Sequence, residues 1–114
     1  MSQFSTKVFR NSTVMFQATW LPDKSLLIGL QEHGANTGVG IVLSLIEAGV
    51  IARALLSRTF DKITRPDGRQ LRITPANHAD PYMEGVHISL LSEQIFLGAE
   101  SIEELVEMIQ YNLN

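Results

Sequence analysis

The chain has 114 residues, no cysteine and a formal net charge of −3 at pH 7. This length predicts a single domain over residues 1–114, and its content of 45% hydrophobic and 18% charged residues is typical of a folded chain. The absence of cysteine excludes a disulfide framework, a thiolate zinc site and a cysteine nucleophile, and the acidic balance argues against a general nucleic-acid binder.

The first part of the chain predicts three strands. Residues 1–6 are polar and lack the apolar core of a secretory signal, so we expect a disordered tail and a cytoplasmic protein. Residues 7–9 and 13–20 predict the first two strands, and apolar and polar residues alternate in the second. Residues 25–30 predict a third strand, whose continuous apolar run is typical of the centre of a sheet.

A glycine-rich loop and an apolar helix are expected next. We interpret residues 39–56 as one continuous helix with Gly49 in its interior, because the residues after Gly49 have high helix propensity. Glu47 and Arg53 interrupt the apolar sequence, so we expect no membrane span. The loop before the helix contains Gly34, Asn36, Thr37, Gly38 and Gly40. Its asparagine or its threonine is suited to cap the N-terminus of the helix.

The second half of the chain predicts two hairpins separated by a loop. Residues 60–64 and 70–74 lie on either side of a Pro-Asp-Gly turn, which is a good hairpin signal. Residues 75–85 contain two prolines and scattered polar residues, and we expect an irregular loop there. Residues 86–91 and 94–97 predict the final hairpin.

The chain ends in a predicted amphipathic helix. Ser101 and Glu104 form a capping box at its predicted start, and the apolar residues that follow recur on one face. The predicted order of elements is ββ-β-α-ββ-ββ-α. We therefore expect an α+β fold with a mostly antiparallel sheet, and with the long central helix and the C-terminal helix packed on one face of that sheet.

The glycine loop is the first candidate site. Backbone N–H groups at the N-terminus of a helix favour anions, so the loop is suited to a small anionic ligand such as a nucleotide. Thr37 would add a hydroxyl group, and Arg65, Arg69 and Arg72 of the predicted hairpin would add positive charge. The glycine spacing matches neither the dinucleotide fingerprint nor the nucleotide P-loop, and the conformational freedom of glycine explains the loop without a ligand.

Two residues of the loop at 75–85 suggest a metal site. His78 and Asp80 have the spacing of two ligands, and a remote histidine would complete the site of a metal-dependent hydrolase. Such spacings are common by chance, and the sequence identifies no hydrogen-bonding partner that would orient the imidazole. We therefore expect no catalytic residues, no metal ligands and no cofactor.

The leading hypothesis comes from the central helix. Gly40, Ser44, Ala48 and Ala52 recur every four residues, and in one helix they would form a ridge of small side chains. Such a ridge lets another backbone approach closely, either within the chain or in a second copy, and two-fold dimers are the commonest oligomers. We therefore expect a non-catalytic protein-interaction module that acts as a homodimer through this ridge, with a further protein partner.

Overall fold

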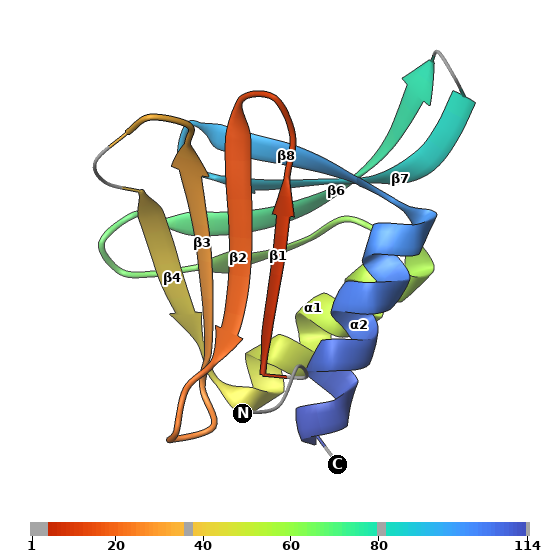
Figure 1. The fold of residues 1–114 in the computed structure, drawn as a ribbon. Helices are drawn as coiled ribbons and strands as arrows, with labels where there is room; N and C mark the ends of the chain where they lie inside the picture. The colour runs from red at the N-terminus through yellow and green to blue at the C-terminus, as the bar shows by residue number, and fades with distance from the viewer. Residues whose placement is uncertain (1–4, 36–37, 80–81, 114) are drawn as a thin grey trace.

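Two four-stranded antiparallel sheets and two helices make up the computed structural model, which describes residues 5–35, 38–79 and 82–113. The elements are β1 (Thr6–Arg10), β2 (Val14–Trp20), β3 (Leu26–Glu32), β4 (Val39–Leu43), α1 (Leu45–Ser57), β5 (Asp61–Thr64), β6 (Gln70–Ala79), β7 (Tyr82–Leu90), β8 (Glu93–Gly98) and α2 (Ala99–Leu113). The sheets have the orders β1-β2-β3-β4 and β5-β6-β7-β8. Their strands run across each other, and both helices lie on one side of the molecule (Figure 1).

The order ββββα occurs twice along the chain, because α1 follows the first four strands and α2 follows the second four. The two helices pack against each other, and each also contacts the first strand of the other half. Helix α1 contacts β5, and helix α2 contacts β1. This exchange of contacts joins the halves around one hydrophobic core.

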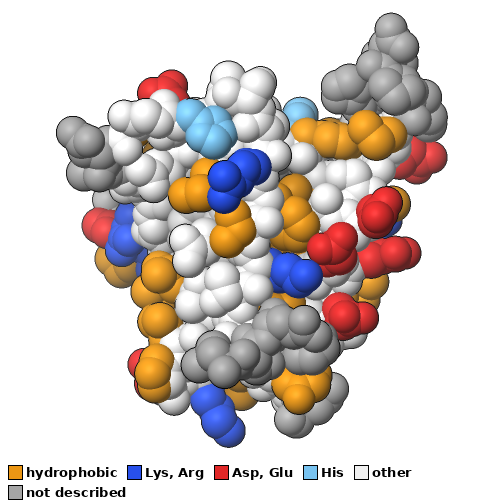
Figure 2. All heavy atoms as spheres, in the orientation of Figure 1, with side chains coloured by type: hydrophobic (Ala, Val, Ile, Leu, Met, Phe, Trp, Pro, Cys, Tyr) orange, Lys and Arg blue, Asp and Glu red, His pale blue; other side chains and the backbone are white. Residues whose placement is uncertain are grey.

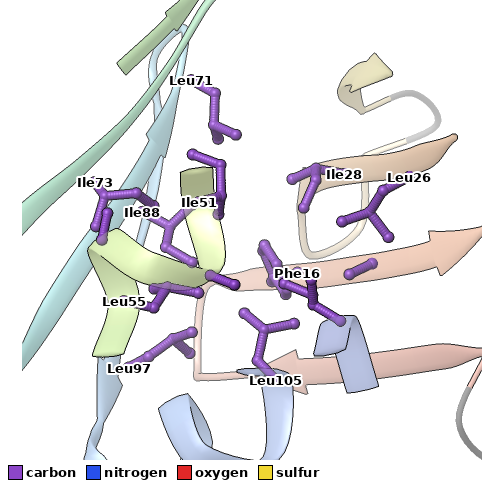
Figure 3. Close-up of a cluster of buried hydrophobic side chains, with 14 of the residues drawn as sticks. Phe16, Leu26, Ile28, Ile51, Leu55, Leu71, Ile73, Ile88, Leu97 and Leu105 are labelled. Atoms are coloured by element: carbon purple, nitrogen blue, oxygen red, sulfur yellow. The ribbon is translucent and has the colours of Figure 1, made fainter. Parts of the chain in front are cut away.

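The core lies between the two sheets and the helices (Figure 3). Along β2 and β3, buried residues alternate with more exposed ones, so each strand turns one set of side chains inward. The second sheet turns its apolar face toward the same interior. The labelled core residues are Phe16, Leu26, Ile28, Ile51, Leu55, Leu71, Ile73, Ile88, Leu97 and Leu105. Among the described residues, no polar or charged residue is buried.

The fold class predicted from the sequence is confirmed, but the predicted start of the central helix, residue 39, is wrong. Residues 39–43 form strand β4, and α1 begins only at Leu45. Ser44 is the N-cap: its Oγ accepts a hydrogen bond from the Glu47 N–H at 3.2 Å, and Glu47 Oε1 accepts one from the Ser44 N–H at 3.0 Å. This capping box satisfies two N–H groups and sets the helix start. Helix α1 then continues through Gly49, as predicted.

The irregular loop predicted at residues 75–85 is also wrong, because β6 and β7 form a long hairpin that extends beyond the body of the molecule (Figure 1). Pro75 lies within β6, where a residue without an N–H is usually excluded. Strand β5 pairs with β6 only up to Ile73, so Pro75 lies where one side of β6 is a free edge. An edge position tolerates proline, and the strand continues.

Two predicted boundaries at the ends of the chain are shifted. Helix α2 begins at Ala99, two residues before the capping box predicted at Ser101. Its predicted apolar face is buried as expected, with Leu105 fully inside the core. At the other end, Thr6 already pairs with Thr19, so the predicted tail is too long. Residues 1–4 lie outside the described residues.

Candidate interaction surface

The glycine loop does not lead into a helix. It connects β3 to β4, so its N–H groups do not lie at a helix N-terminus, and this premise of the anion site is wrong. Gly34 has a φ of 83°, which favours glycine, and a Cβ at Gly38 would lie 2.8 Å from the Leu30 carbonyl oxygen. Backbone geometry therefore accounts for both glycines. Asn36 and Thr37 lie outside the described residues.

The arginines of the β5–β6 turn bind the junction between β4 and α1. Arg65 donates from Nη1 and Nη2 to the Glu47 carboxylate at 2.9 and 2.6 Å, and from Nη2 to the Val42 carbonyl at 2.6 Å. Arg69 Nη1 donates to the Gly40 carbonyl at 2.6 Å. Because β4 is an edge strand, these guanidinium groups close part of its free edge. The hydrogen bonds from Arg65 hold the pKa of Glu47 below its ordinary value.

These contacts change the interpretation of the basic hairpin. Arg65 and Arg69, expected to bind an anion beside the glycine loop, are instead hydrogen-bonded to the chain itself. Arg72 is exposed and lies over the Phe60 ring, 5.7 Å from its centroid. The three arginines thus hold different structural contacts rather than converging on one pocket.

Only one of the two proposed metal ligands belongs to the described residues. His78 belongs to β6, and Asp80 lies outside the described residues. Over 5–35, 38–79 and 82–113, no group of three or more histidine or acidic side chains could hold a metal ion. The hydrolase hypothesis therefore stays a prediction without support from the described residues.

The four small residues do not form one ridge. Gly40 lies in β4 and Ser44 is the N-cap, so only Ala48 and Ala52 belong to the helix. Both alanines are buried in the core of the same chain, with 0% and 2% of their surface exposed. The four-residue spacing describes a helical face only where the backbone is helical, and β4 is extended. The ridge is therefore wrong as a surface for a second copy.

The opposite face of α1 is exposed and largely apolar. Ile46 is 82% exposed, Leu56 is 49% exposed and Leu45 is 39% exposed, while Val50 is half-buried. Residues 46, 50 and 53 are three or four positions apart and lie on one side of the helix. A surface helix usually presents polar residues there, so this arrangement requires an explanation. We call Leu45, Ile46, Val50, Arg53 and Leu56 the α1 face.

The sequence contained a signal that would have located this face. Ser44 and Glu47 have the S-x-x-E spacing of a capping box, which places the helix start at residue 45. A helix that begins at residue 39, as predicted, presents the small residues rather than Ile46 as its contact surface. The error in the start assigned the predicted interface to the buried side of the helix.

No protein-family profile matches the sequence, and no curated protein matches it. Within the described residues, no helix has the length and apolar character needed to cross a bilayer.

Proposed function

We propose that the protein is a non-catalytic interaction module that forms a homodimer through the α1 face and works in the cytoplasm. The exposure of Ile46 carries the proposal, because it leaves 82% of an isoleucine in water at the start of a well-capped helix. Full burial of such a side chain contributes about 1.5–3 kcal/mol. A chain without cysteine also suits a reducing compartment.

A second copy is the occupant that the face fits, because a two-fold axis would place the stem of Arg53 over the exposed Ile46 of the other copy. In an antiparallel pair of α1 helices centred between residues 49 and 50, Arg53 of each copy lies across from Ile46 and Glu47 of the other. The methylene stem of Arg53 would cover the isoleucine, and its guanidinium would approach the carboxylate. Arg53 would thus join the ion pair that Glu47 already forms with Arg65 of its own chain.

The size of the face sets the expected affinity. Helix α1 has 13 residues and is therefore about 20 Å long, which is short for the roughly 800 Å² per partner of a specific interface. Val42, which is 45% exposed at the end of β4, extends the apolar surface next to the helix start. An interface of this size with one strong apolar anchor predicts a Kd in the micromolar range.

Light scattering after size exclusion tests the proposal. The unmodified chain should show a molar mass that rises with concentration from 12.7 kDa toward twice that value. The range from about 1 to about 200 μM brackets a micromolar Kd. A mass of 12.7 kDa at every concentration would refute the homodimer.

A further inference from the structure

A hollow of about 360 Å³ lies where strand β8 passes into helix α2. Its floor comes from the second sheet and includes Met83, Phe96 and Gly98. Its wall is the beginning of α2, including Glu100 and Glu104. None of these residues belongs to the α1 face.

Two glycines leave space at this end of the second sheet, and Met83 and Phe96 give the floor of the hollow its apolar surface. Gly85 and Gly98 pair across β7 and β8. A Cβ at Gly85 would lie 2.9 Å from Phe96 Cζ, so the phenylalanine ring lies over that glycine. A Cβ at Gly98 would lie 3.5 Å from the Met83 sulfur and 3.9 Å from Phe96 Cε2. A flexible thioether and an aromatic edge therefore border an open space, and Met83 is 42% exposed.

The wall of the hollow is acidic and continues along α2. Glu103 and Glu107 are exposed on the same helix as the two glutamates of the wall. Figure 2 shows acidic side chains gathered on the side of the molecule where α2 lies. Lys7 of β1 bonds Glu104 at 3.3 Å, and no other described ion pair involves these four glutamates. Of the two glutamates that line the hollow, Glu100 thus has no ion pair among the described residues, and Glu103 and Glu107 continue the acidic surface along α2.

We propose that this hollow binds a basic amphipathic helix of a protein partner. One apolar side chain of the partner enters the space between Met83 and Phe96, and its Lys or Arg side chains face the glutamates of α2. A metal ion would use the carboxylates but would leave the apolar floor empty, so the floor favours a peptide. The inference rests on the proposed role as an interaction module. It does not rest on the homodimer, because its residues come from β7, β8 and α2.

A synthetic peptide tests the inference. The probe is a peptide of about 14 residues, or about four helical turns, built from leucine and lysine in an amphipathic order. Titrated into the ¹⁵N-labelled full chain, it should shift the amide signals of Met83, Gly98 and Glu100. Binding measured by fluorescence anisotropy should weaken in high salt, because the carboxylates are exposed. Met83→Ser should weaken it about tenfold, as expected for loss of a central apolar contact.

Matched variants and a second peptide make the test specific. Leu91→Ser and Glu93→Gln change one exposed apolar residue and one carboxylate at the distant β7–β8 turn, and should leave the Kd unchanged. A peptide of the same composition in a non-amphipathic order should bind at least about tenfold more weakly. Equal binding of both peptides, or shifts that omit Met83 and Gly98, would show attraction by charge alone and overturn the inference, as would no binding.

The same variants separate this inference from the homodimer. Met83→Ser and Glu100→Gln should keep the molar mass of the unmodified chain when no peptide is present. A loss of mass in either variant would identify a second copy as the occupant of the hollow and overturn the inference. Failure of the α1 dimer would instead appear as a 12.7 kDa unmodified chain that still binds the peptide.

Discussion

Replacing Gly49 by alanine should stabilise the protein. Glycine in a helix interior costs about 1 kcal/mol relative to alanine, because the unfolded glycine backbone has more freedom to lose. Gly49 lies inside α1 and is not among the positive-φ residues. A Cβ there would meet only Leu113 Cδ1, at 3.9 Å, which is ordinary van der Waals contact. The full propensity difference should therefore appear as a gain of about 1 kcal/mol, which raises the Tm by about 4 °C.

Thermal unfolding followed by circular dichroism measures this gain. All variants must be compared at about 1 μM or less, where the chain is a monomer. Self-association makes the Tm depend on concentration, and Gly49 lies beside the proposed two-fold axis. Gly85→Ala is the matched control: its Cβ would collide with the Leu97 carbonyl oxygen, so it should destabilise. A Tm lowered by Gly49→Ala would refute the reasoning, since it would mean that α1 is broken at Gly49 or that Leu113 is packed more tightly.

Three further changes test individual contacts. Ser44→Ala removes the N-cap of α1 and should cost about 1 kcal/mol in thermal unfolding, whereas Ser101→Ala, inside the first turn of α2, should cost much less. Leu105→Ala removes a fully buried side chain and should cost about 2–5 kcal/mol by urea unfolding; a smaller loss would mean that α2 is not docked. Glu47→Gln should cost about 1–2 kcal/mol at pH 7, because the bond from Arg65 is charge-assisted but partly exposed. That bond lowers the folded pKa of Glu47, so its stabilisation is present above the ordinary value of 4.5 and is lost as the pH falls through the folded pKa. The Tm difference between Glu47→Gln and the unmodified chain should therefore shrink below pH 4.5, and a constant difference would contradict the ion pair.

The sequence predicted most strands and both helices, and its main error lies between residues 39 and 44. Apolar residues run without a break from β4 into α1, and such a run does not separate a buried strand from a buried helix. Ile41 and Leu43 are buried while Val42 is exposed, which is the alternation of a strand. In the sequence Val42 is as apolar as its neighbours, so this alternation becomes visible only when burial is known.

The two proposed interaction surfaces were harder to predict because each depends on contacts between distant segments. Helix α2 and the second sheet cover one side of α1, and these contacts determine which side of the helix remains exposed as the α1 face. The hollow beside α2 needs Gly85 and Gly98 to pair across two strands, and Gly85 belongs to the segment predicted as an irregular loop. The roles of Arg65 and Arg69 likewise follow from a turn that reaches back to β4.

The molar mass of Ile46→Glu tests the central claim, that α1 carries the dimer interface, most directly. The variant places a charge at a position that is 82% exposed in the single chain, so the unfolding free energy of the monomer should change by no more than about 0.5 kcal/mol. Leu91→Glu makes the same change at a residue that is 57% exposed in the β7–β8 turn, far from α1. At a concentration where the unmodified chain is a dimer, Ile46→Glu should show a mass of 12.7 kDa and Leu91→Glu twice that mass. A folded Ile46→Glu variant that remains a dimer would contradict the account.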